Sequence, residues 1–224
     1  MVLLALDTSL EACSVAVLAA DRVTVRSEPL ARGHAERIMP MIGAVMAEAG
    51  VGYPDLGRIA VTIGPGSFTG VRVGVSVARG LALVLGVPAV GVATLAALAA
   101  DPATGEGVRV AAIDAKRGEV YVAVHEGTRE IAPPAALALA EAARAVPEGV
   151  PIVGSGAAGL DAAMAEIGRR AGPLLPLAAP AIKAVARLGA AAVPPFASPA
   201  PLYLRAPDAK PQAGSGLLGE RPPA

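Results

Sequence analysis

Two segments of the sequence repeat each other at an offset of 107 residues, and this repeat limits the folds open to the chain. Ala5-Leu6-Asp7 matches Ala112-Ile113-Asp114, and Val15-Ala16-Val17 matches Val122-Ala123-Val124. In each copy an apolar run ends in an aspartate, a turn follows, and a Val-rich run comes next. Short apolar runs bounded by turn residues predict buried strands. The repeat therefore predicts two related α/β units, each of which begins with a strand hairpin and an aspartate.

A glycine loop also recurs, with Gly64-Pro65-Gly66 matched by Gly154-Ser155-Gly156 at an offset of 90 residues. Each half then predicts the order strand, strand, strand, helix, strand, helix. We expect an N-terminal lobe at residues 1–106, a reduced C-terminal lobe at 107–194, and an extended, partly disordered tail at 195–224. Two such ribonuclease-H-like lobes in tandem resemble the superfamily of actin, the sugar kinases and the heat-shock ATPases. In that superfamily the first hairpin of each lobe brings backbone N–H groups and an acidic residue to nucleotide phosphates.

Composition excludes several classes of function. Lys plus Arg and Asp plus Glu both number 19, which argues against a basic nucleic-acid binder. Two Phe, three Tyr and no Trp are too few for a platform that stacks single-stranded bases. One Cys and two distant His exclude a disulfide framework and predict no metal site. We expect no signal peptide and no membrane span, because Arg72 and Arg79 interrupt the most apolar stretch, and hence a cytoplasmic protein.

The loop from Gly64 to Gly70 is the sharpest local motif. It lies between a predicted strand and a predicted helix, where its N–H groups and the helix N-terminus could hold an anion. No Lys-Ser/Thr pair follows its last glycine, so it is not a Walker loop. The alternative, equally weighted, is that the glycines allow the helix to pack closely. The candidates for a weak nucleotide or phosphate contact are Asp7, Thr8, Ser9, Gly64, Gly66 and Ser67.

Two early helices are candidates for a protein interface. The helix predicted at Gly33–Gly50 holds three of the five Met, and the helix at Val71–Leu85 is apolar nearly all round. Core packing would explain both features, but methionine-rich apolar faces also serve as adaptable interfaces. We expect another chain to cover these helices. The candidate interface residues are Ile38, Met39, Met41, Ile42, Val45, Met46, Val71 and Val75.

Four longer motifs occur in one order along the chain: LALDTSLEACSVAV at residues 4–17, RGHAER at 32–37, GPGSFTGVRVG at 64–74 and AIDAKRGEVY at 112–121. Together with Tyr203-Leu204-Arg205, they closely resemble the bacterial TsaB (YeaZ) family. The resemblance runs from Val2 to about Arg205. It implies a part in making threonylcarbamoyladenosine on tRNA, at the adenosine beside the anticodon.

The resemblance also implies partners and a role. Family members look like degenerate copies of the catalytic subunit TsaD, bind TsaD through helices, and are joined by the ATPase TsaE. Isolated members often form homodimers through the same surface. Catalytic relatives hold a metal with two His four residues apart, and Thr94 and Leu98 stand at those positions here. We therefore expect no catalytic residue, no metal and no required cofactor in this chain, contact with tRNA through the complex, and ATP or ADP at most at the complex interface.

Two alternatives remain open. The chain could be an independent ATPase or small-molecule kinase of the actin-like class, in which case it should bind and turn over ATP. It could also recognise tRNA directly through Lys116, Arg117 and their neighbours, in which case binding by the chain alone should depend strongly on salt. The zero net charge argues against the second alternative.

Overall fold

The computed structural model describes residues 1–205, and the end of the tail, where we expected disorder, lies outside the described residues. This part of the chain contains two five-stranded sheets. The first consists of β1 (Val2–Asp7), β2 (Ala12–Ala19), β3 (Arg22–Pro29), β4 (Leu56–Thr62) and β5 (Ala89–Val92). The second consists of β6 (Val108–Lys116), β7 (Glu119–Glu126), β8 (Arg129–Ala138), β9 (Ile152–Val153) and β10 (Leu174–Leu175).

The two sheets have the same topology. The strand order is β3-β2-β1-β4-β5 in the first sheet and, in the matching direction, β8-β7-β6-β9-β10 in the second. In both, the first three strands form an antiparallel meander, the fourth strand pairs in parallel with the first, and the fifth pairs in parallel with the fourth. The predicted duplication and the fold class, two tandem α/β lobes, are therefore confirmed. The second lobe is the reduced copy, since β9 and β10 have two residues each.

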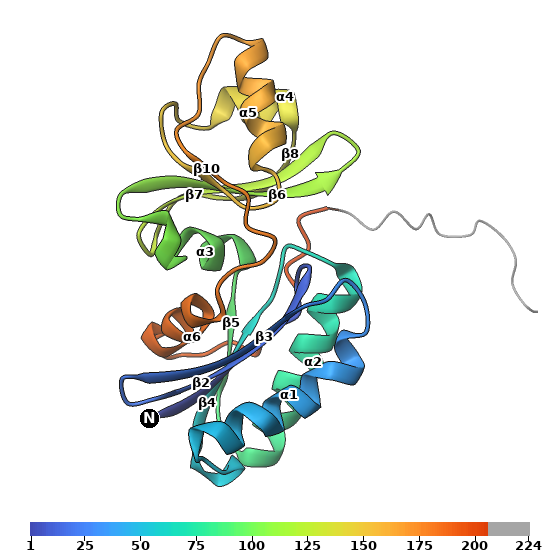
Figure 1. Cartoon of the computed structure of the whole chain (residues 1–224), viewed down its shortest axis with the longest axis vertical. Coiled ribbons are helices and arrows are strands. Elements are labelled where there is room, and N and C mark those ends of the chain that lie inside the picture. Colours follow the sequence, from blue (N-terminus) through green and yellow to red (C-terminus); the bar gives the residue numbers. More distant parts are fainter. Residues whose placement is uncertain (206–224) are drawn as a thin grey trace, which may run out of the picture.

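The helices are α1 (His34–Ala49), α2 (Phe68–Leu85), α3 (Thr94–Ala99), α4 (Leu139–Ala145), α5 (Ala157–Glu166) and α6 (Ile182–Ala191). Figure 1 shows α1 and α2 on the outer face of the first sheet, α4 and α5 on the outer face of the second, and α3 and α6 between the sheets.

The two inner helices are exchanged between the lobes. Helix α3 follows the first sheet in sequence but packs on β6 and β7 of the second, where Leu95 and Leu98 share a buried cluster with Ile113. Helix α6 follows the second sheet but packs on β1, β2 and β4 of the first. Our assignment of residues 107–194 to the C-terminal lobe is thus wrong for α6. Sequence order alone assigns α6 to the C-terminal lobe, because it follows the second sheet. Its apolar side, however, packs on the inner face of the first sheet.

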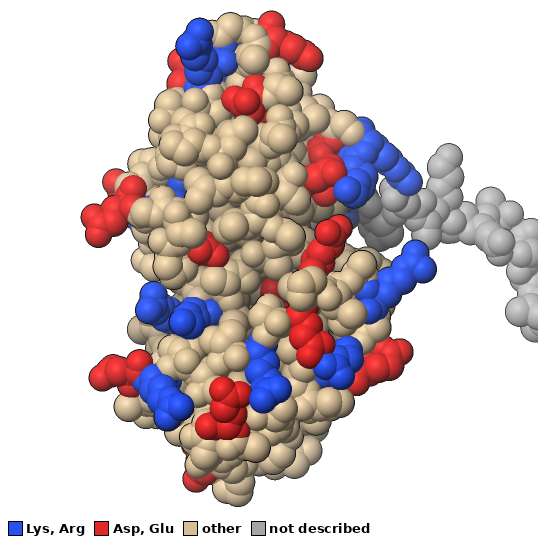
Figure 2. Space-filling model, viewed as in Figure 1, with Lys and Arg blue, Asp and Glu red and all other residues tan. Residues whose placement is uncertain are grey.

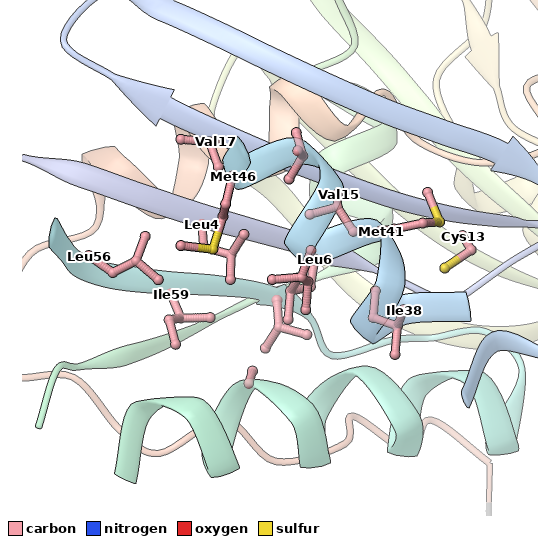
Figure 3. Close-up of a cluster of buried hydrophobic side chains, with 14 of the residues drawn as sticks. Leu4, Leu6, Cys13, Val15, Val17, Ile38, Met41, Met46, Leu56 and Ile59 are labelled. Atoms are coloured by element: carbon pink, nitrogen blue, oxygen red, sulfur yellow. The ribbon is translucent and has the colours of Figure 1, made fainter. Parts of the chain in front are cut away.

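The main core of the first lobe lies between its sheet and the two outer helices. Figure 3 shows Ile38, Met41 and Met46 of α1 pointing at the strands, beside Leu4 and Leu6 of β1. Burying a large aliphatic side chain of this kind contributes about 1.5–3 kcal/mol. The apolar side of α1 that faces the sheet therefore forms part of the core that stabilises its own lobe.

Residues 193–205, which we call the C-terminal strap, lead from the end of α6 along the first lobe and on to the second. At its start, Arg58 donates to the carbonyl oxygens of Gly189, Ala190 and Ala192 and lies over the ring of Phe196. Further on, the N–H of Leu202 donates to the carbonyl oxygen of Ile63 at 2.7 Å. The strap ends at the second lobe, where Arg205 reaches Ala115 and Glu119 in the β6–β7 hairpin.

Candidate functional site

The strand-end turn (Asp7, Thr8 and Ser9) is closed and internally bonded. All three residues are fully buried. Asp7 Oδ1 accepts hydrogen bonds from the backbone N–H of Ser9 at 2.9 Å, from Ser9 Oγ at 2.6 Å and from Thr62 Oγ1 at 2.6 Å. An acceptor that takes three donors from its own chain is a structural junction between β1 and β4.

The glycine loop packs directly on this turn. The N–H of Ser67 donates to the carbonyl oxygen of Ser9 at 2.7 Å, and Thr8 Oγ1 donates to the carbonyl oxygen of Gly70 at 2.7 Å. A Cβ atom at Gly70 would overlap the carbonyl oxygen of Thr8, and one at Gly74 would lie 2.6 Å from Thr8 Oγ1. Glycine is needed here because the two backbones approach within the space of a methyl group.

This geometry supports the close-packing explanation of the glycines. Close packing is what the loop achieves, and the turn leaves no exposed surface for a phosphate in this conformation. Gly66 also packs against Ser9, and Gly64 is buried beneath Leu202 of the strap. Among the six phosphate candidates only Ser67 is exposed, and its Oγ caps α2 by accepting from the N–H of Gly70 at 3.3 Å.

Burial raises the pKa of Asp7 above its ordinary value, against the opposing effect of the hydrogen bonds from Ser9 and Thr62. Its second oxygen, Oδ2, is buried without a hydrogen-bond partner among the described residues. Burial also raises the pKa of the Cys13 thiol, to about 11, so this thiol stays protonated and unreactive near neutral pH. Among residues 1–205 there is no cluster of three or more His, Cys, Asp or Glu side chains placed to hold a metal ion.

The matching turn of the second lobe is exposed. Asp114 forms an ion pair of 2.8 Å with Lys116, and its side chain is 42% exposed. Hydrogen bonding to Lys116 lowers the pKa of Asp114. Lys116 and Arg117 both have positive φ, at 62° and 56°, which few residues with a side chain adopt. Figure 2 shows Lys and Arg interspersed with Asp and Glu over the visible face, without a broad patch of one sign.

The structure corrects our assignment of the interface residues. Ile38, Ile42 and Val45 are 0% exposed, and the other members of the set with exposures of 4% or less are Met41, Met46, Val71 and Val75. These side chains fill the core under α1 and α2, so they cannot touch a partner in this conformation. Met39, at 43% exposed, is the one proposed anchor that faces outward. The helical spacing of these apolar residues was predicted correctly, but the side of the helices on which they lie packs against the sheet and not against a partner.

The outer side of α1 and α2, which we call the helix face, is nevertheless unusually apolar. Only 28% of α2 is buried, although its length and composition would suffice for a membrane span. Leu83 and Val84 are 85% and 83% exposed. The other exposed positions that build the face are Ala35, Met39, Pro40, Gly43 and Ala47 on α1, and Thr69, Arg72, Ser76 and Gly80 on α2. Two hollows of about 440 and 500 Å³ lie along α2.

Sequence reasoning missed three residues at the N-terminal end of this face. The guanidinium of Arg72 lies over the ring of Phe68, 3.6 Å from its centroid, and Arg72 Nε donates to Tyr203 Oη at 2.7 Å. The two rings are 5.6 Å apart. An aromatic and an arginine at helical spacing (68 and 72) signal a stacked pair. Nothing local in the sequence, however, shows that Tyr203 folds back onto them.

The chain matches known proteins over most of its length. The model of the family described as "TsaD: tRNA N6-adenosine threonylcarbamoyltransferase" matches residues 24–210. A solved structure titled as an uncharacterized protein with similarity to peptidase YEAZ, from Pseudomonas aeruginosa, superposes with a TM-score of 0.80 at 34% identity. It covers 91% of this chain and 99% of that one. An uncharacterized protein of Mycobacterium tuberculosis H37Rv is 35% identical over 94% of both chains.

Named relatives match over a shorter stretch. The protein "tRNA threonylcarbamoyladenosine biosynthesis protein TsaB" of Escherichia coli is 42% identical over 128 residues, which is 56% of this chain and 55% of that protein. The protein of the same name in Haemophilus influenzae is 46% identical over 54% of this chain and 52% of its own length. The match thus spans about half the length of these curated relatives. From the full-length structural match and these names, the chain belongs to the TsaB (YeaZ) family, within the wider group that the TsaD model describes.

Proposed function

We propose that this chain is a non-catalytic subunit of the machinery that makes threonylcarbamoyladenosine on tRNA next to the anticodon. It binds the catalytic protein TsaD through the helix face and activates it. The observation that carries the proposal is this apolar face, which no described part of the chain covers, beside a strand-end turn closed by its own backbone. The names of the TsaB relatives and the match to the TsaD model support the pathway.

The absence of catalysis by this chain is supported by the residues that stand where chemistry would be needed. Asp7, the acidic residue of the first hairpin, is buried and bonded to Ser9 and Thr62. Thr94 and Leu98, at the positions that the resemblance assigns to metal-binding histidines in catalytic relatives, are both 0% exposed. Neither side chain is a ligand for a transition metal in such a site.

The size of the helix face suits a stable interface. At a rise of 1.5 Å per residue, α1 and α2 are roughly 25 Å long, and two packed helices present a face about 20 Å wide. The projected area is about 500 Å² on this chain, so an interface over the whole face would bury roughly 1,000 Å² in total, the lower bound for a specific complex. Exposed Leu83, Val84 and Met39 would supply the apolar centre. The same face would serve a homodimer of the isolated chain, so homodimer and heterodimer should exclude each other.

The remaining parts of the proposal follow from the family resemblance. TsaE joins the pair, tRNA is reached through the complex, and the complex works in the cytoplasm. The chain needs no cofactor of its own, because its glycine loop is filled by the strand-end turn. A nucleotide, where one is present, would lie at the interface with TsaD.

Reconstitution of threonylcarbamoyl transfer tests the proposal. Metal-loaded TsaD, TsaE, tRNA and the threonylcarbamoyl donor are combined with and without this chain, and modified tRNA is counted. We expect transfer only with the chain present. We also expect Val84→Asp to abolish both transfer and capture of TsaD. Arg187→Ala should leave both unchanged, because Arg187 is an exposed residue of α6 on the opposite face of the first sheet. Full transfer by TsaD and TsaE alone would contradict the proposal, as would ATP turnover by the isolated chain.

A further inference from the structure

Arg72 is the one charged side chain at the centre of the N-terminal half of the helix face. It lines the hollow of about 440 Å³ together with Ala35, Phe68, Thr69, Val73, Ser76 and Val77, none of which is charged. None of the ion pairs formed within residues 1–205 involves Arg72. The hollow therefore holds an unmatched positive charge in apolar surroundings.

The guanidinium is also held in one orientation. Its plane stacks on Phe68, and its Nε is engaged by Tyr203 Oη, so the Nη groups are the donors left over. Phe68 is 56% exposed and Tyr203 is 50% exposed, although the whole chain contains only five aromatic residues. Fixing an arginine by stacking lowers the entropy that it loses when it binds an anion.

We propose that Arg72 is the receptor for a carboxylate side chain of the protein that covers the helix face. The inference rests on the proposed function, since it assumes that a protein partner docks there. A carboxylate fits because the two Nη groups of a fixed guanidinium can donate to its two oxygens. When the partner covers the hollow, water is displaced and the ion pair is strengthened. Arginine and tyrosine are also among the residues that most often dominate interface energies.

A protein carboxylate is favoured over an RNA phosphate by the surroundings of Arg72. Phosphate binding by nucleic-acid proteins relies on several cations in one region. The 440 Å³ hollow contains one cation and is otherwise lined by small, hydroxyl-bearing or apolar side chains. The one charge in this hollow matches one acid on a partner segment.

The test uses the full chain and the TsaD protein of the same organism, with dissociation constants measured by calorimetry at low and high salt. Arg72→Met keeps the packing on Phe68 and removes the charge. We expect it to weaken binding about tenfold or more and to remove most of the salt dependence. Arg72→Lys should lose nearly as much, because the ammonium offers no planar fork. Tyr203→Phe, which removes one hydrogen bond, should lose a few-fold.

Arg187→Ala serves as the matched control, because it removes an exposed helical arginine on the other side of the first sheet. Thermal melting checks that each variant is folded. Unchanged affinity of Arg72→Met would overturn the inference while the proposed function stands. A loss in Arg72→Ala but none in Arg72→Met would show packing instead of charge and overturn it too. Binding of tRNA by the chain alone, lost in Arg72→Met, would assign the residue to a phosphate. Failure of the wild-type chain to bind TsaD would overturn both proposals.

Discussion

The two lobes share one strand order but place their equivalent aspartates in opposite environments. Asp7 is fully buried and bonded to Ser9 and Thr62, whereas the side chain of Asp114 is 42% exposed and paired with Lys116. Both glycine loops pack closely on the first hairpin of their own lobe, since a Cβ at Gly66 would overlap the carbonyl oxygen of Ser9 and one at Gly156 would lie 3.1 Å from the backbone of Ala112. The duplication therefore preserves the backbone and leaves the environment of each hairpin free to diverge.

The outer helices differ in the same way. Helices α1 and α2 have 16 and 18 residues, whereas α4 and α5 have 7 and 10. The long pair covers its sheet with one side and still presents an apolar outer side, with Leu83 and Val84 almost fully exposed. A lobe that only had to fold would gain nothing from such a surface, which suggests that the first lobe is specialised for a partner.

The largest effect should come from opening the close packing of the first lobe. In Gly70→Ala the new methyl group would overlap the carbonyl oxygen of Thr8, a backbone atom that cannot move alone. We expect a loss of about 3 kcal/mol or more in the free energy of unfolding, measured by urea denaturation. Gly80→Ala is the control on the same helix, where nothing lies within 4 Å of the new atom. It should stabilise the chain by about 0.5–1 kcal/mol. Equal effects of the two changes would show that the loop is not closed as described.

A smaller effect should separate the two aspartates. Asp7→Ala leaves the donors of Ser9 and Thr62 buried without an acceptor, which should cost about 2 kcal/mol. Asp114→Ala removes an exposed ion pair and should cost about 0.5 kcal/mol or less. Chemical denaturation of both variants at neutral pH measures the difference. If Asp114→Ala proved the more damaging change, the assignment of Asp7 as the structural junction would be wrong.

The topology could be predicted from the sequence because apolar runs, turns and glycine loops are local signals. The repeat strengthens the prediction, since the same order of signals occurs in both halves. The exchange of α3 and α6 could not be predicted, since which sheet an amphipathic helix covers depends on contacts far away in sequence. The length of β8 is equally hard to predict from sequence. Ala135 and Ala136 lie in an alanine-rich run that favours a helix, but they pair with Val122 and Tyr121 and extend the sheet. Tertiary pairing overrides the helical propensity of alanine there.

The candidate site was harder to predict than the fold. Helical periodicity located the apolar stripe of α1 but could not say whether the stripe meets the sheet or a partner. Residues such as Ile42 satisfy both descriptions in sequence, and only burial distinguishes them. Leu83, Val84 and the group around Arg72 lie off the buried stripe, where an apolar residue is unexpected. That departure from amphipathicity was the available signal for the helix face.

The last contrast concerns pH, because the two aspartates should give the free energy of unfolding opposite pH dependences. Burial raises the pKa of Asp7 above its unfolded value of 3.8, so the folded state binds the proton more tightly. Stability arising from Asp7 should then fall as pH rises from about 4 through the raised pKa. The pKa of Asp114 is lowered, so its contribution is present above pH 3.8 and is lost as pH falls through the lowered value. Solvent screening keeps that second effect small.

Urea denaturation of the wild type, Asp7→Asn and Asp114→Asn between pH 3 and 8 measures both pH dependences. The stability of the wild type relative to Asp7→Asn should decrease with rising pH, whereas that relative to Asp114→Asn should increase. The same slope for both pairs would contradict the burial of an unpaired Asp7 oxygen, and with it the claim that the duplicated hairpins have diverged.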